Sequence, residues 1–247
     1  MRRQQRCELD AILRGWAGQY NNPDFIKSDP IQFPHKYDGR KAEVSGFITA
    51  WLSFGNRKAI VEKAGEIDAS FMGDPYSWVM ARDYRSHFNN HGKIYRFLSH
   101  HDMYLLGKRL HELYMSYETM EEYVMSQPDK HPVQSLSEYF HGVNGIADYG
   151  KGSACKRLCM FLRWMVRNDG LVDMGLWQHI SPTELIIPLD THVHKVALEL
   201  GITDRKQADM KTAMMITDYF RGLFPEDPAL GDFALFGAGI SGNLLGE

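Results

Sequence analysis

The sequence predicts an all-α fold, and three observations support this prediction. Apolar residues recur at helical spacing through most of the 247-residue chain. The segments between these runs carry Gly, Pro and Asn, which end helices. Alternating runs of β-branched residues bounded by hairpin turns, which are typical of β-sheets, are absent. A content of 44% apolar and 24% charged residues is ordinary for a folded protein with a substantial core.

The expected helices of the first half follow from this spacing. Residues 3–20 place Leu9, Leu13 and Trp16 near helical spacing, and Asn21-Asn22-Pro23 ends the run. We expect further helices at residues 41–54, 60–67, 75–84, 102–116 and 118–125, then a loop at 127–133 and a short helix at 135–142.

The second half contains the most apolar of the expected helices. Residues 153–167, "SACKRLCMFLRWMVR", are apolar on most of the helical circumference, which predicts a buried central helix. An irregular insertion with one short turn follows at 168–185. The remaining expected helices are at residues 191–200 and 206–223, before the terminal piece "GDFALFGAGISG".

Composition limits the setting of the protein. Cys7, Cys155 and Cys159 form neither a disulfide framework nor a CxxC pair, and no apolar run approaches the roughly 20 residues that span a bilayer. We therefore expect an intracellular, cytoplasmic protein without membrane association. Cys155 and Cys159 are expected to pack as small apolar residues rather than to bind zinc. The net charge of −3 means that any nucleic-acid site must be a local basic patch.

The central helix carries such a local concentration of positive charge. Lys151, Lys156, Arg157, Arg163 and Arg167 fall within one window that holds no acid, and Lys156, Arg163 and Arg167 share one helical stripe. Lys156 lies in the first turn, where free backbone amides bind a phosphate and disfavour an ammonium. This position favours the neutral, nucleophilic form of the lysine. A solvated surface lysine is the simpler alternative.

The segment "IIPLDTHVHKVALEL" at 186–200 places Asp190 directly before a helix. An Asp in this position caps the helix by accepting hydrogen bonds from its first amides. It is also a carboxylate fixed at a helix start, where it can take part in chemistry. Both interpretations of Asp190 remain open on the sequence alone.

Together, "GSACK" at 152–156 and "IIPLDTHVHKVA" at 186–197 resemble the helix-hairpin-helix DNA glycosylase superfamily. In its bifunctional members a Gly-x-x-x-Lys element carries the catalytic lysine, and a Val-Asp-Thr-His-like element carries the catalytic aspartate. The resemblance thus implies that Lys156 and Asp190 are catalytic. Their separation is longer than in the endonuclease III branch and resembles that of the archaeal 8-oxoguanine DNA glycosylase branch.

A second resemblance covers most of the chain. The pieces "GFITAWLSFGNRK", "SACKRLCMFLRWMVR", "LWQHISPTELIIPLDTHV" and "DFALFGAGI" are similar to an uncharacterised bacterial family. The sequence departs from the superfamily where the hairpin Leu-Pro-Gly-Val-Gly is replaced by "ADYGKGSAC". The four C-terminal cysteines of the iron–sulfur branch are absent, so the resemblance implies no cluster and no other cofactor.

The superfamily resemblance implies a single two-lobed unit with a central cleft, one lobe from about 1–30 plus 168–247 and the other from about 31–167. It implies a monomeric DNA base-excision glycosylase, with lyase activity through a lysine Schiff base, that acts on damaged DNA; an oxidised purine is one candidate base. The expected nucleic-acid contacts are Lys151, Gly152, Arg157, Arg163, Asn56 and Arg57, with Asn56 as the residue inserted into the strand. The expected base-pocket aromatics are Trp51, Phe54, Phe161, Trp164 and Trp177.

Two other function classes remain open. "SHHD" at 99–102, with His87, His91 and Asp190, is compatible with the His-Asp metal site of all-α HD phosphohydrolases. A glycosylase-like fold that binds nucleic acid or a protein without catalysis is the second. Borohydride trapping separates the enzyme from the binding module, and metal analysis separates both from the hydrolase.

Overall fold

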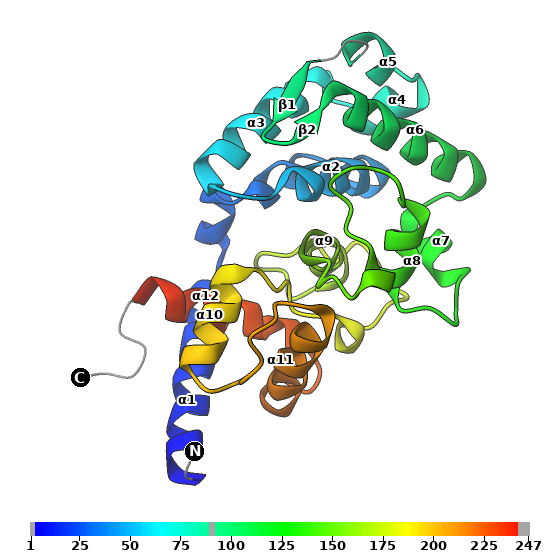
Figure 1. Cartoon of the computed structure of the whole chain (residues 1–247). Helices are drawn as coiled ribbons and strands as arrows, with labels where there is room; N and C mark the ends of the chain where they lie inside the picture. Colours follow the sequence, from blue (N-terminus) through cyan, green and yellow to red (C-terminus); the bar gives the residue numbers. More distant parts are fainter. Residues whose placement is uncertain (1–2, 89–91, 242–247) are drawn as a thin grey trace.

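The computed structural model describes residues 3–88 and 92–241, and these are mostly helical with one small two-stranded hairpin, which confirms the all-α prediction (Figure 1). The α-helices are α1 (Arg3–Tyr20), α2 (Gly39–Leu52), α3 (Arg57–Ser70), α4 (Pro75–Met80), α5 (Tyr84–His87), α6 (His100–Ser116), α7 (Met120–Met125), α8 (Pro132–Tyr139), α9 (Lys156–Val166), α10 (Thr191–Glu199), α11 (Met210–Leu223) and α12 (Gly231–Ser241).

Short 3₁₀ helices occupy several of the connections. They are η1 (Pro23–Ser28), η2 (Pro30–Gln32), η3 (Pro34–Lys36), η4 (Tyr149–Lys151), η5 (Pro182–Glu184) and η6 (Pro228–Leu230). No helix among the described residues is long and apolar enough to cross a membrane.

Helix α9 lies in the middle of the molecule, where it packs on α2 and α8 (Figure 1). Every residue from Phe161 to Val166 is buried, as the sequence predicts for a central helix. The helix begins at Lys156 rather than at residue 153, because Cys155 has a left-handed backbone with φ of +47° that interrupts helical geometry. The consequence is that Lys156 is the first residue of α9.

The two ends of the described chain pack against each other. Helix α1 lies against α12, and α12 also contacts α10 (Figure 1). Gly237 of α12 faces Tyr20 of α1 so closely that a Cβ atom would overlap its ring. Small residues on α12 thus allow α1 to approach and cover its apolar side.

A small hairpin is present where only helices were expected. Strand β1 (Lys93–Tyr95) pairs antiparallel with β2 (Leu98–Ser99), and the turn holds Arg96 with φ of +52°. Its strands are too short to give an alternating apolar pattern in the sequence, and the buried side chains of Ile94 and Leu98 help to anchor it. Nearby, the helix expected at 75–84 is divided into α4 and α5 at Arg82, which has φ of +62°.

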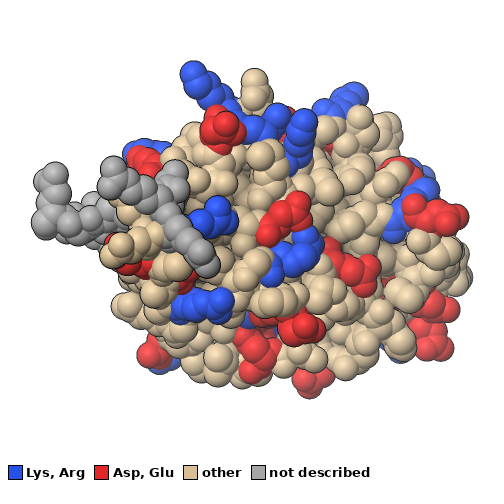
Figure 2. All heavy atoms as spheres, turned by 90° about the horizontal axis from the view of Figure 1, so that it is seen from below, with Lys and Arg blue, Asp and Glu red and all other residues tan. Residues whose placement is uncertain are grey.

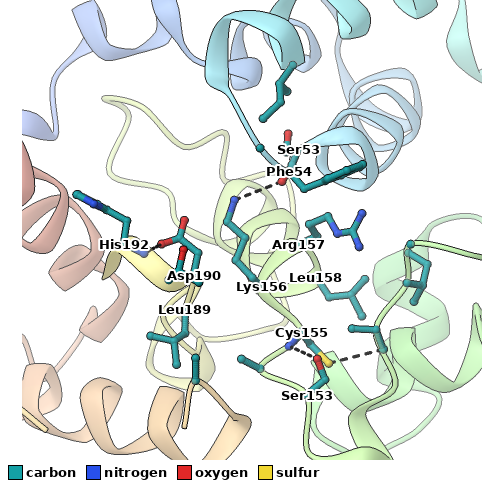
Figure 3. Close-up of a pocket in the computed structure, with 18 residues that line it drawn as sticks. Ser53, Phe54, Ser153, Cys155, Lys156, Arg157, Leu158, Leu189, Asp190 and His192 are labelled. Carbon is teal, nitrogen blue, oxygen red and sulfur yellow. Dashed lines mark hydrogen bonds between the residues drawn. The ribbon is translucent and has the colours of Figure 1, made fainter. Parts of the chain in front are cut away.

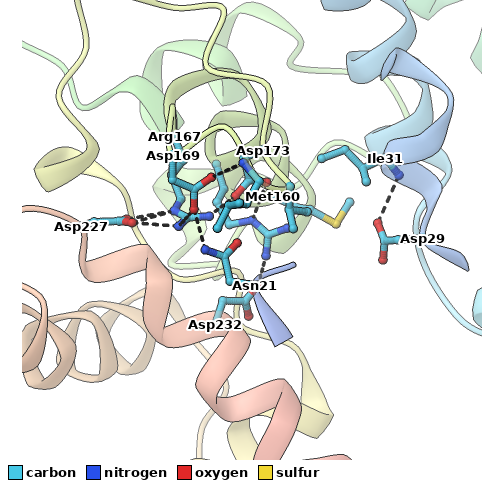
Figure 4. Close-up of polar contacts among 12 residues, drawn as sticks. Asn21, Asp29, Ile31, Met160, Arg167, Asp169, Asp173, Asp227 and Asp232 are labelled. Carbon is cyan, nitrogen blue, oxygen red and sulfur yellow. Dashed lines mark hydrogen bonds and ion pairs between the residues drawn. The ribbon is translucent and has the colours of Figure 1, made fainter. Parts of the chain in front are cut away.

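A buried ion network joins α9 to the C-terminal part of the chain (Figure 4). Arg163 binds Asp173 and Asp232, while Arg167 binds Asp173, Asp169 and Asp227. Both guanidinium groups and the Asp173 carboxylate are almost completely buried. Because Asp232 is in the first turn of α12 and Asp227 precedes η6, these pairs fix α12 relative to α9.

We predict that Asp173→Ala destabilises the protein by about 3–5 kcal/mol, because it leaves two buried guanidinium groups without a shared counter-charge. Urea unfolding followed by circular dichroism measures the change. Asp218→Ala is the control, since Asp218 forms an exposed pair with Arg221 and is expected to change stability by less than about 1 kcal/mol. Equal effects of the two substitutions would contradict the role of the network.

Candidate functional site

A cavity of about 560 Å³ opens at the N-terminal end of α9 (Figure 3). It lies between the start of α9, the start of α10 and the loop after α2, and Lys156, Asp190 and Phe54 line it. A second cavity of about 210 Å³ adjoins it and shares Lys156 and Asp190. The two residues predicted to be catalytic therefore face the same space, at the boundary between the cavities.

Lys156 is held in a partly buried position, and it forms no ion pair with any of the described residues. Its ammonium nitrogen lies 3.4 Å from the carbonyl oxygen of Ser53 and 3.7 Å from the sulfur of Met160. Burial lowers the pKa of Lys156 below its usual value, although Asp190, Asp232 and Asp29 oppose this shift. Helix α9 has no side-chain cap, so its free amides further disfavour a positive charge on its first residue.

Asp190 caps α10 and still reaches the cavity. Its Oδ1 accepts hydrogen bonds of 2.9 Å from the backbone amides of both His192 and Val193. Only this oxygen has hydrogen-bond partners among the described residues, so Oδ2 is free to face a ligand. The capping interpretation is thus confirmed, and it leaves room for a chemical role of the same side chain.

Two further carboxylates face Lys156 and were not anticipated. Asp29 and Asp232 line the smaller cavity, and burial raises the pKa of each. Asp29 caps η2 through a 3.1 Å bond from the amide of Ile31 (Figure 4), while Asp232 pairs with Arg163. The available sequence signals were the Asp-Pro pair before η2 and the "GDFALFGAGI" piece, neither of which indicates contact with Lys156.

The residues expected to contact phosphate lie in different parts of the structure. Arg157 lines the main cavity, where its Nη1 donates a 2.8 Å hydrogen bond to the carbonyl of Trp51 and burial lowers its pKa to about 10. Arg57 lines the smaller cavity and lies 3.7 Å from Asp29. Asn56 caps α3 by accepting a 3.3 Å bond from Ala59.

Of the remaining members of that set, Lys151 and Gly152 line neither cavity, whereas Arg163 lines the smaller one. Lys151 is exposed beside Asp148, at 3.6 Å, and Gly152 supplies a left-handed turn with φ of +75°. The sequence predicts that Arg163 lies around the Lys156 cleft and contacts nucleic acid; it does line the smaller cavity, and the nucleic-acid contact stays a prediction. Arg163 is buried with its guanidinium bound to Asp173 and Asp232, and Arg167 is buried in the same network.

The expected set of base-pocket aromatics is reduced to Phe54. Trp51, Phe161, Trp164 and Trp177 are core residues with at most 3% exposure, so their rings cannot stack on a ligand. Trp51 and Trp177 also use their indole N–H groups internally, on the carbonyl of Asn144 and on Glu43. Phe54, which is partly exposed, lines the main cavity.

The histidine cluster is explained by local structure. Asp102 accepts hydrogen bonds of 2.7 Å from both the amide and the hydroxyl of Ser99, which together form a capping box at the start of α6. His87 contacts the carbonyl of Asp83, and His91 lies outside the described residues. Within residues 3–88 and 92–241, no group of three potential ligands that could hold a metal ion occurs.

Surface charge is mixed on the face seen from below. Figure 2 shows Lys and Arg interspersed with Asp and Glu there, without a broad area of one sign. The cations that line the two cavities are thus a local feature, as the net charge of −3 requires; they are Lys156, Arg157, Arg57 and Arg163.

Comparison with known sequences places the chain in a family. The family described as a protein of unknown function, DUF2400, matches residues 29–241. The chain belongs to this family. The match runs from Asp29 to the last described residue of α12, so it contains Lys156, Asp190 and Asp232. No curated protein and no solved structure matches the chain. Membership of an uncharacterised family is thereby confirmed, and the resemblance to DNA glycosylases stays a prediction.

We predict that Lys156 titrates at lower pH than an ordinary lysine, and that Asp190→Asn lowers its pKa further. The substitution removes a negative charge that favours the ammonium, while Asn caps a helix nearly as well as Asp. Side-chain NMR of labelled lysines measures the pKa, and thermal unfolding should change by less than about 1 kcal/mol. Lys195, exposed on α10, is the internal reference. An unshifted Lys156 would contradict the electrostatic description of the site.

Proposed function

We propose that this DUF2400 protein is a DNA base-excision glycosylase that also cleaves the strand, with Lys156 as nucleophile and Asp190 as the stabilising carboxylate. The observation that carries the proposal is a lysine of lowered pKa that lines the same cavity as a fixed carboxylate with one free oxygen. A neutral amine and a nearby anion are what displacement at the anomeric carbon of a deoxynucleoside needs.

The reaction proceeds through a sugar with oxocarbenium character. As the bond from C1′ to the base breaks, the base leaves with the bonding electrons and Asp190 stabilises the positive charge on the sugar. The neutral Lys156 amine forms a bond to C1′, loses a proton and gives a Schiff base after the ring opens. Loss of a C2′ proton then expels the 3′-phosphate with the electrons of its C3′–O bond, which breaks the strand.

The two adjoining cavities support this chemistry through their size and their charge. A cavity of about 560 Å³ lies within the range of small-molecule sites, and an enzyme acting on a base must flip the nucleotide into such a site. In the smaller cavity, Asp29 and Asp232 offer acceptor oxygens beside Lys156. We expect these oxygens to receive N–H groups of the extruded base.

Lys156→Gln is expected to abolish a borohydride-trapped adduct with lesion-bearing duplexes while leaving binding largely intact, because it removes the amine that forms the Schiff base. Denaturing electrophoresis after incubation with a panel of damaged oligonucleotides measures the adduct. Lys195→Gln, on the exposed face of α10, is the matched control and should trap as the unmodified protein does. An adduct that persists in Lys156→Gln would contradict the assignment.

Asp190→Asn is expected to slow base removal by roughly 10²- to 10³-fold, the size of effect seen when one preorganised electrostatic contact is lost. Single-turnover kinetics measure the rate, and unchanged thermal unfolding shows that the cap is retained. Selective loss of stability without loss of rate would leave Asp190 as a cap alone.

The rate of trapping is expected to rise with pH through the lowered pKa of Lys156, because the amine reacts only when it is unprotonated. The rise should therefore occur at lower pH than for a free lysine side chain. A pH profile of adduct formation under single-turnover conditions tests this. A rate that rises only near the ordinary lysine pKa would contradict it.

A further inference from the structure

The β1–β2 hairpin presents an exposed aromatic ring beside the main cavity. Phe97 in its turn is 54% exposed, although turns of hairpins normally carry polar residues or glycine. Its ring is stacked on Phe54, with centroids 4.4 Å apart and planes 28° from parallel. Because Phe54 lines the cavity, the stacked pair leads from the cavity to the solvent-exposed face of Phe97.

The backbone of the hairpin turn is strained in a way that supports this arrangement. Arg96, which precedes Phe97, has φ of +52°, a left-handed conformation that residues other than Gly, Asn and Asp seldom adopt. Opposite it, Gly55 has φ of +93°, and its missing side chain leaves the space that the Arg96 guanidinium occupies. The β1–β2 hairpin therefore packs against the loop after α2 at Gly55.

Two guanidinium groups flank the stacked rings. Arg157 lies 5.0 Å and Arg96 6.0 Å from the ring centroid of Phe54. Among the described residues neither forms an ion pair, whereas Arg163 and Arg167 are each neutralised by carboxylates. An aromatic face with uncompensated cations beside it is complementary to a flat ring carried on a phosphate backbone.

We propose that Phe97, supported by Phe54 and flanked by Arg96 and Arg157, is a stacking platform for an unpaired nucleobase of a DNA strand. Stacking of a base on Phe97 requires only a single-stranded or distorted segment of DNA. Its location beside the Lys156 cavity rests on the proposed function: the stacked base is a neighbour of the nucleotide that enters the cavity.

The test uses oligonucleotides that contain the fluorescent base 2-aminopurine, whose emission falls when it stacks on an aromatic ring. One is a plain single strand, and the other is a duplex with 2-aminopurine beside a tetrahydrofuran abasic analogue that cannot be cleaved. Phe97→Ala is expected to weaken binding of both by about tenfold and to remove the quenching, whereas Phe97→Trp retains both. Arg96→Ala is expected to reduce the salt dependence of binding.

The matched control is Met72→Ala, since Met72 is 90% exposed in the turn after α3 and outside both cavities. Binding and quenching by Phe97→Ala equal to those of Met72→Ala would overturn the platform. So would the absence of binding to either oligonucleotide at low salt, an outcome that favours a protein partner for Phe97. Circular dichroism shows whether each variant is folded.

A parallel excision assay separates this proposal from the proposed function. If the unmodified protein removes no base from any lesion but Phe97→Ala still loses binding and quenching, the platform stands and the catalytic assignment fails. If base removal depends on Lys156 while Phe97→Ala binds and quenches normally, the catalytic assignment stands and the platform fails.

Discussion

The arrangement of the site depends on the two buried arginines of α9. Arg163 and Arg167 carry full positive charges into the protein interior, which is favourable only when carboxylates surround them closely. Those carboxylates come from the loop after α9, from the segment before α12 and from the first turn of α12. Folding the arginines into the core therefore requires α12 to be in place, and α12 brings Asp232 into the cavity beside Lys156.

Lys156 lies on the same helix as these arginines, but no carboxylate of a described residue is paired with its amine. Three carboxylates raise its pKa, yet none forms an ion pair with it, and burial has the larger effect. The folded state thus binds a proton on Lys156 less tightly than the unfolded chain does, so the free energy of unfolding decreases as the pH falls from the ordinary lysine pKa to the lowered one. A cost of this kind is typical of functional sites.

Part of this site could be predicted from the sequence, because its signals lie within short segments of the chain. Lys156 and Asp190 both lie where a helix begins, and helix starts have recognisable signals in short segments. Asp29 and Asp232 also lie at such starts, but nothing local indicates that two segments so far apart in the chain meet at Lys156. Helical spacing places Lys156, Arg163 and Arg167 on one stripe of α9, but it does not indicate which segments cover that stripe. Burial likewise distinguishes Phe54, which lines the cavity, from the tryptophans, which lie in the core. Composition alone does not show which aromatic residues are exposed.

Helix α1 has a consequence for how the boundaries of this family are drawn. The sequence match begins at residue 29, whereas α1 ends at Tyr20 and covers the apolar side of α12. A truncated chain that starts at the family boundary would expose Phe233 and Phe236 of α12, which contact Phe25, and would lose Asn21 from Asp169. The segment before the family match thus supports the helix that carries Asp232, and the folded unit is longer than the region that defines the family.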